Sequence, residues 1–145
     1  MIARIRPARA EDGAALADLT TELGYPTDAE AMLSRVGAVL GQADVVVLVA
    51  VDPTDRPIAW IHVGVAHTLQ QDAHAVIHGL VVSEAHRSAG IGADLLAAGE
   101  EWARRRGLLM VLVRSRSTRR GAHRFYLDRG YAEIKRSHVF EKRLV

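Results

Sequence analysis

The chain has 145 residues, of which 49% are hydrophobic and 25% are charged, and its formal net charge is +2. This length and composition predict one globular domain, residues 1–145, with a sizeable core. The absence of Cys excludes disulfides and thiolate metal ligands, and no apolar run approaches the ~20 residues that cross a bilayer. Because the first residues do not form a signal peptide, we expect a cytoplasmic protein without membrane partners.

The first half of the chain predicts a strand, two helices and a strand hairpin. Leucines recur at helical spacing up to Leu23, and Gly24–Pro26 ends that helix. A capping-box pattern over Thr27–Glu30 starts the next helix. The expected elements are a strand over 1–6, helices over 10–23 and 27–40, and strands over 44–51 and 57–66.

The second half predicts a strand–helix–strand unit, a further helix and a closing hairpin. The expected elements are a strand over 74–82, a helix over 90–106, a strand over 108–113, a helix over 119–129, and paired strands over 131–134 and 137–144. The unit from 74 to 113 is expected to form a right-handed parallel crossover. This order of strands and helices indicates an α/β (α+β) fold.

The most informative segment is the glycine-bearing turn after the strand that ends at Val82. Such a turn exposes backbone N–H groups at the positive end of a helix dipole, which suits a diphosphate. Gly90 and Gly92 let the backbone approach a ligand closely, and Arg87 adds a cation. The turn lacks the third Gly of a dinucleotide fingerprint and the Lys of a P-loop. The seven His residues are scattered, so no metal site is expected.

This turn resembles the pyrophosphate loop of the GCN5-related N-acetyltransferase (GNAT) superfamily, which reads Arg/Gln-x-x-Gly-x-Gly/Ala. Residues 87–92, Arg-Ser-Ala-Gly-Ile-Gly, match that pattern in full. Residues 122–131 are similar to a second family segment, Ala-His-x-Phe-Tyr-x-x-x-Gly-Phe/Tyr, at the right separation. The resemblance implies a mixed, mostly antiparallel twisted sheet that is splayed at its middle strands and flanked by about four helices.

The resemblance also implies an acyl-CoA N-acyltransferase. Such an enzyme moves an acetyl group from acetyl-CoA to a primary amine by direct transfer in a ternary complex, here with a small-molecule acceptor expected. The absence of a cysteine nucleophile is consistent with direct attack. The coenzyme contacts that the resemblance implies are Leu80, Val81, Val82, Arg87, Ser88, Ala89, Gly90, Ile91, Gly92, Ala93 and Ser117. Arg116 and Ser117 stand where relatives often have an Asn.

The family places a tyrosine opposite the thioester sulfur, and Tyr126 is the matching residue. A phenol of pKa ~10 can protonate a departing thiolate, although a packing role beside Phe125 is the alternative. His78 stands where many relatives have a Glu, and we expect it to act as the base. His62, Glu22 and a water relay compete for that role, and a structural histidine is the other interpretation.

The first two helices and the loop between them build the acceptor side in this superfamily. On that basis Glu22, Tyr25, Trp60 and His62 are expected to bind the acceptor, while helix-terminus charge and packing are their alternative roles. Arginines gather between Arg104 and Arg124. They are either solvated helix faces, with their stems packed on the surface, or a rim for the coenzyme phosphates. Nucleic acid is disfavoured because no aromatic residues are interleaved for base stacking.

Two other functions remain open from the sequence. One is a non-catalytic acyl-CoA-binding regulatory module that uses the same cleft. The other is an acetylating toxin that acts on aminoacyl-tRNA, which the arginine cluster motivates and which a steep salt dependence of RNA binding would support. A homodimer is also compatible with the resemblance, because closing strands in this family often pair across subunits.

Overall fold

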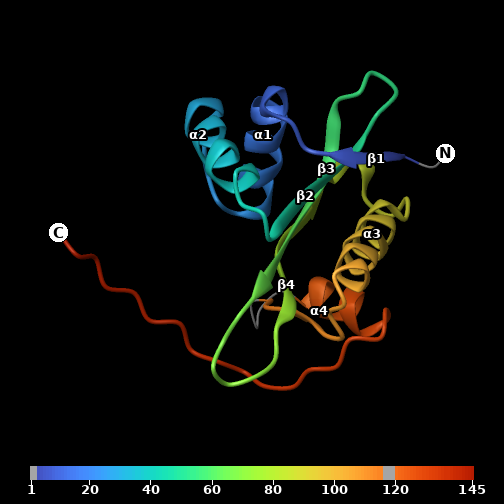
Figure 1. Ribbon diagram of the computed structural model, residues 1–145. Coiled ribbons are helices and arrows are strands. Elements are labelled where there is room, and N and C mark those ends of the chain that lie inside the picture. The colour runs from blue at the N-terminus through green and yellow to red at the C-terminus, as the bar shows by residue number, and fades with distance from the viewer. Residues whose placement is uncertain (1–2, 116–119) are drawn as a thin grey trace. The chain divides into compact units, whose positions relative to one another are not determined.

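The computed structural model describes residues 3–115 and 120–145 (Figure 1). The chain forms two compact units, Met1–Arg114 and Ser115–Val145. The first unit contains the following elements in chain order: β1 (Arg4–Pro7), the 3-10 turn η1 (Ala10–Asp12), α1 (Gly13–Leu23), α2 (Ala29–Leu40), β2 (Val45–Val51), β3 (Pro57–Ala66), β4 (His74–Val82), the 3-10 turn η2 (Glu84–His86), α3 (Ile91–Arg105) and β5 (Val111–Val113). The second unit contains α4 (Arg120–Leu127).

The sheet has the strand order β1-β2-β3-β4-β5. Neighbouring strands are antiparallel except β4 and β5, which pair in parallel through three residues of each strand. The last parallel pair joins Ile77 to Val113, so the second half of β4 extends beyond the reach of β5. The predicted mixed, mostly antiparallel sheet that splays at its middle strands is therefore confirmed.

Helices cover both faces of this sheet (Figure 1). On one face, residues of α1 and α2 form a core cluster with β2, in which Val47 and Trp60 also pack. On the other face, α3 approaches β3 so closely that a Cβ at Gly99 would lie 3.1 Å from Ile61 and from Val63. The absence of a side chain at Gly99 thus lets α3 seal this face of the sheet.

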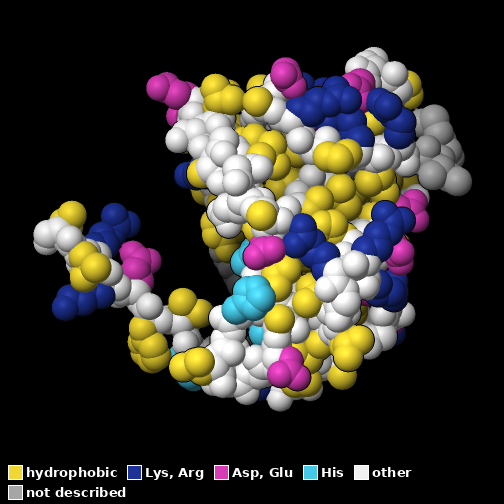
Figure 2. Space-filling model, in the orientation of Figure 1, with side chains coloured by type: hydrophobic (Ala, Val, Ile, Leu, Met, Phe, Trp, Pro, Cys, Tyr) yellow, Lys and Arg dark blue, Asp and Glu magenta, His cyan; other side chains and the backbone are white. Residues whose placement is uncertain are grey.

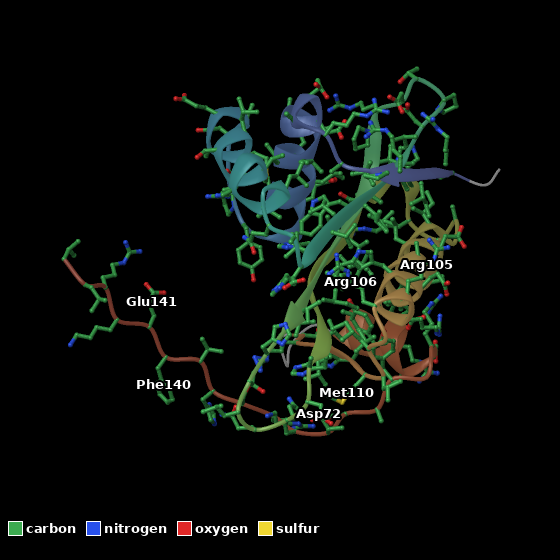
Figure 3. All side chains as sticks on the ribbon, viewed as in Figure 1. Asp72, Arg105, Arg106, Met110, Phe140 and Glu141 are labelled. Carbon is green, nitrogen blue, oxygen red and sulfur yellow. The ribbon has the colours of Figure 1, made fainter. Side chains whose placement is uncertain are left out.

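Local signals set the helix boundaries. Asp28 caps α2 by accepting a hydrogen bond from Ala31 N at 2.8 Å. Gly24, with φ of 113°, ends α1 in the left-handed conformation. At the other end of the sheet, Arg106 follows α3 and donates to Asp44 Oδ1 at 2.9 Å and to Ala43 O at 2.8 Å, which ties the helix to the start of β2 (Figure 3).

An ion-pair network joins β1 to η1 and to the turn between β2 and β3. The buried Arg6 guanidinium binds both carboxylate oxygens of Asp12 at 2.9 Å and donates through Nε to Asp55 at 3.0 Å. Arg4 and Arg9 also pair with Asp55. Figure 2 shows these basic side chains gathered over β1 and the turn. Burial raises the pKa of Asp12, but hydrogen bonds from Arg6 and from Arg9 N outweigh it and hold the pKa below its usual value.

The second unit differs from the prediction at its end. Residues 131–145 form no strand, so the predicted closing hairpin is wrong. Ile134, Val139 and Phe140 are exposed there, and Figure 3 shows Phe140 and Glu141 on an extended segment. The apolar alternation gives strand character without specifying a partner, and Lys135 and Arg136 supply none of the turn chemistry that closes a hairpin. An isolated two-stranded hairpin is only marginally stable.

Smaller differences concern element ends. The first predicted helix begins as a 3-10 turn before α1, and the last strand of the first unit covers only Val111–Val113 instead of 108–113. Leu109 is fully exposed, which explains why the apolar run before β5 does not belong to the buried strand.

We predict that Asp12→Asn lowers the free energy of unfolding by about 3 kcal/mol at pH 7. The substitution leaves the buried Arg6 without its bidentate partner, although Asp55 still pairs with it. Because the folded pKa of Asp12 is lowered, its contribution is complete above the unfolded pKa of about 4 and is lost as the pH falls through the folded pKa. Wild-type protein should therefore lose more stability than the variant between about pH 5 and pH 3. Urea denaturation at each pH measures both effects.

Asp18→Asn is the matched control, because Asp18 pairs with Arg56 at 3.1 Å on the exposed surface. It should cost at most about 1 kcal/mol. Equal losses for the two variants would contradict a stabilising role of the buried pair.

Candidate functional site

The open edge of β4 is the first feature of the site. Residues of an antiparallel ladder turn their N–H and C=O groups alternately toward the partner strand and away from it. Ser83 N donates to Ile58 O beside β3 at 2.8 Å, so Leu80 and Val82 turn their backbone groups away from β3. Among the described strands, none pairs with this side of β4 beyond Ile77. An extended ligand that carries amides can therefore hydrogen-bond along Leu80 to Val82.

Arg87 lies at the end of this edge. Its Nε donates to Val82 O at 3.1 Å, while the guanidinium is exposed. The side chain thus satisfies the last free carbonyl of the strand and carries a positive charge beside the following turn.

The turn between β4 and α3 is the second feature. Ser88 and Gly90 both have positive φ, at 70° and 82°. The first hydrogen bond of the helix runs from Asp94 N to Gly90 O, so the N–H groups of residues 91–93 have no intrahelical acceptor. A left-handed non-glycine residue at this place stores local strain, which is common at ligand sites. The turn therefore offers several N–H groups and a helix N-terminus to an anion.

The expected coenzyme residues of this stretch differ in exposure. Ile91 and Val81 are buried and anchor the helix start and the strand. The other residues are more accessible to solvent: Leu80, Val82, Gly92 and Ala93 are half-buried, and Arg87, Ser88, Ala89 and Gly90 are exposed.

Three aromatic side chains form a row on the sheet face that carries α1 and α2. Trp60 packs against the core cluster of that face, and its ring lies over Gly79, where a Cβ would come within 2.5 Å of the indole. His62 follows on β3, and its ring centroid lies 4.6 Å from that of His78 on β4. The structure therefore brings together Trp60, His62 and His78, which we predicted as two acceptor residues and a base.

Burial sets the protonation of the two histidines. It lowers the pKa of His62, and the neighbouring His78 lowers it further, to about 4. Burial also lowers the pKa of His78. Both imidazoles are thus neutral at neutral pH, and each has a ring nitrogen that can accept a proton.

Glu22 and Tyr25 lie elsewhere. Glu22 Oε1 accepts a hydrogen bond from Glu84 N at 3.4 Å, and it lines a cleft of about 640 Å³ between α1 and the end of β4. Ser83 and His86 form the opposite wall of that cleft, whose lining contains neither the aromatic row nor Tyr25. Tyr25 is 54% exposed just after α1. The four predicted acceptor residues thus divide between the row, the cleft and the surface.

Two functional positions escaped the sequence analysis. Gly79 accommodates the Trp60 ring, and a Cβ at Gly64 would lie 3.0 Å from His78 Nε2. A glycine inside an otherwise apolar strand pattern is a signal for close approach, and it could have found both.

The remaining predicted residues belong to the end of the chain. Ser117 lies outside the residues that the structure describes. Tyr126 belongs to α4 of the second unit, where its ring packs edge-on against Phe125 at 5.2 Å and against Tyr131 at 5.5 Å between centroids.

Within residues 3–115 and 120–145, no group of three or more His, Asp or Glu side chains is arranged to hold a metal ion. In the same part of the chain, no helix combines the length and the apolar character needed to span a membrane.

Comparison with known proteins decides the family. The sequence model of the acetyltransferase (GNAT) family matches residues 15–131. The chain belongs to the GNAT family. Members of this family are acetyltransferases, and acetyl-CoA is their acetyl donor.

Individual GNAT proteins support this assignment. The uncharacterized N-acetyltransferase YhdJ of Bacillus subtilis (strain 168) is 37% identical over 75 residues, which are 52% of this chain and 52% of YhdJ. The match thus spans about half the length of that relative. The aminoglycoside antibiotic 6'-N-acetyltransferase AAC(6')-Ih from Acinetobacter baumannii superimposes with a TM-score of 0.84 at 20% identity, covering 98% of this chain and 99% of that one. AAC(6')-Iy, in complex with the bisubstrate analog CoA-S-monomethyl-acetylneamine, gives 0.83 at 17% identity and covers 97% of both chains.

The features of this GNAT chain fit its coenzyme. Coenzyme A carries a diphosphate and an arm with two amides, and the site offers an N–H-rich turn beside a strand edge whose N–H and C=O groups point away from β3. At Gly90 no described atom lies within 4 Å of an added Cβ, so a ligand can reach the backbone there.

We predict that Gly90→Val weakens coenzyme A binding at least tenfold, because a β-branched residue at φ of 82° costs about 1–3 kcal/mol and distorts the turn. Isothermal titration calorimetry measures the affinity.

Gly107→Val is the matched control. Gly107 has φ of 74° at the other end of α3, and a Cβ there also meets nothing within 4 Å, so the strain is similar but the turn is spared. If both variants bind coenzyme A like wild type, or both lose the same affinity, the turn is not the binding element.

Proposed function

We propose that the chain is an amine N-acetyltransferase that transfers the acetyl group of acetyl-CoA directly to a primary amine of a small molecule. The proposal treats residues 1–145 as one catalytic domain. The observation that carries it is the open edge of β4, where Leu80 and Val82 turn their backbone groups away from β3, next to the turn with free N–H groups.

The coenzyme would lie along β4. The N–H groups of residues 88–93 would hold its diphosphate, and the backbone of Leu80 and Val82 would hydrogen-bond to the amides of its arm. Arg87 then moves from Val82 O to the phosphates, which keeps the carbonyl available for the arm. A backbone N–H at this edge polarises the thioester carbonyl, and loss of such a donor typically costs about 10²–10³ in rate. Ser117 stays a predicted contact of the arm.

When bound, acetyl-CoA supplies an acetyl group on a thioester, and a C–N bond forms as the C–S bond breaks. An acceptor that arrives as an ammonium ion gives up two protons. His78 accepts the first and passes it to water, which leaves the lone pair of the amine free to attack. Tyr126 donates a proton to the departing sulfur and is reprotonated by the second amine proton, so the products are an amide, a thiol and one released proton.

The acceptor would lie on the face of α1 and α2. Trp60 and His62 offer a flat aromatic floor next to His78, and Tyr25 and Glu22 lie at the end of α1. The fold similarity to AAC(6')-Ih, an aminoglycoside antibiotic 6'-N-acetyltransferase, supports a small amine with several hydroxyl groups as the acceptor class.

Free-thiol release from acetyl-CoA across a panel of amines tests the proposal. The chain has no Cys, so a thiol dye reports the released coenzyme alone. We expect acceptor-dependent release with at least one polyhydroxylated small amine. If no amine releases thiol while coenzyme A raises the melting temperature, the proposed small-molecule acceptor is wrong, and the result favours a binding module or a macromolecular acceptor.

We predict that Tyr126→Phe lowers kcat more than tenfold and leaves the affinity for coenzyme A unchanged. The phenyl ring preserves the contacts with Phe125 and Tyr131, while the proton donor is lost, and general acid catalysis is worth about 10²–10⁴ in rate. Steady-state kinetics and calorimetry separate the two effects.

Tyr131→Phe serves as the control, because it removes a hydroxyl from the same aromatic group. It should change kcat less than twofold. A smaller than tenfold loss for Tyr126→Phe at unchanged affinity would rule out Tyr126 as the general acid.

A further inference from the structure

A β-bulge brings two histidines together. In the ladder of β3 and β4, His62 lies opposite Gly79 and Val63 lies opposite Ile77, so His78 is an extra residue of β4. Such a bulge changes the face on which the extra side chain lies. The His78 ring consequently lies beside that of His62, with centroids 4.6 Å apart and ring planes inclined by 45°.

Gly64 provides the space for this arrangement. A Cβ at Gly64 would lie 3.0 Å from His78 Nε2 and 3.4 Å from its Cδ2, which is closer than side chains normally approach. The His78 ring therefore lies close to the β3 backbone at Gly64 and beside the imidazole of His62. A side chain at position 64 would require the His78 ring to shift by at least a few tenths of an ångström.

The surroundings of the two rings contain little charge. Val47, opposite His62 on β2, is apolar. Asp44, before β2, alternates to the other face and pairs with Arg106, and Glu22 of α1 reaches Glu84 N. The pKa of His62 responds to burial and then to His78, and that of His78 to burial. Of the described groups, His78 is thus the one that acts on His62 electrostatically.

A proton on either ring opposes a second proton on the other, because two like charges at this separation repel. His78 is the more exposed of the two and accepts the proton at lower cost, since water solvates the imidazolium. His62 stays neutral and keeps its ring against that of His78. The pair therefore takes up one proton at a time.

We infer that His62 is a positioning residue for His78: neighbouring strands hold the two imidazoles side by side over Gly64, so that His78 is aimed at the acceptor amine. The inference rests on the proposed function, in which His78 takes the first proton of the amine. His78 lies two residues before Leu80, about 7 Å along the strand. That spacing suits an amine held between the base and a thioester bound at the open edge.

NMR titration of the His78 imidazole in wild type, His62→Ala and His62→Phe tests the inference. In His62→Ala, water replaces the neighbouring ring, so the midpoint of His78 should rise by about half a pH unit or more. The apparent pKa of the acid limb in the pH profile of kcat/KM should rise by the same amount, and kcat should fall. His62→Phe retains an aromatic ring beside His78 and should restore most of the wild-type midpoint and kcat.

His67→Ala is the matched control, because His67 lies just beyond β3 and is 70% exposed. It should leave the midpoint unchanged. Gly64→Ala is a second variant that alters neither histidine, and it should raise the midpoint by displacing the His78 ring. It decides the question if His62→Ala does not fold.

An unchanged His78 midpoint in His62→Ala or, failing that, in Gly64→Ala overturns the inference. The inference is also overturned if the titration midpoint of His78 shifts while the acid limb of the kcat/KM profile stays in place, because His78 then does not take the amine proton. The absence of thiol release with every amine overturns the proposed function instead, and the NMR midpoint still decides whether His62 positions His78.

Discussion

The structure depends on a strand that is paired on one side and unpaired on the other. Backbone N–H and C=O groups normally find partners, and an open strand edge inside a sheet is therefore costly to maintain. Here β5 ends its pairing at Ile77, while α3 packs on β3 and β4 from one face and α1 from the other. The packing holds the second half of β4 extended, so that Leu80 and Val82 keep their backbone groups available. Arg87 satisfies one of them through Val82 O.

Strand alternation separates the two substrates of the proposed reaction. The same strand presents its backbone along its edge and its side chains to the faces, so coenzyme and acceptor need not compete for the same atoms. On the α3 face, apolar side chains such as Ile61 and Val63 form the core. On the opposite face, Trp60, His62 and His78 remain accessible beyond the core cluster. The proposed reaction would thus take place at the border between the core and solvent.

Local patterns in the sequence were sufficient for most of the fold. Strands over 57–66 and 74–82 were predicted with their observed ends, because Pro57 and the glycine turn mark them clearly. The prediction of a closing hairpin was wrong because an alternation of apolar and polar residues does not specify which strand it pairs with. The contact of His62 with His78 could not be predicted, since a single extra residue in β4 decides on which face His78 lies. The hydrogen bond from Glu84 N to Glu22 could not be predicted either, because it joins residues that are far apart in the sequence, and Glu22 stays a predicted acceptor residue.

In the proposed reaction, where His78 is the base, the choice of histidine at position 78 has a physical consequence. A carboxylate beside the half-buried His62 would raise the pKa of that imidazole, and the resulting ion pair would hold the base in a bound, less reactive state. Two imidazoles avoid this, because both are neutral before the reaction and their burial costs little. The charge then appears only when the amine proton arrives, on the ring that faces solvent. Burial lowers the proton affinity of His78, so the proton also leaves readily to water and the base is regenerated for the next acceptor.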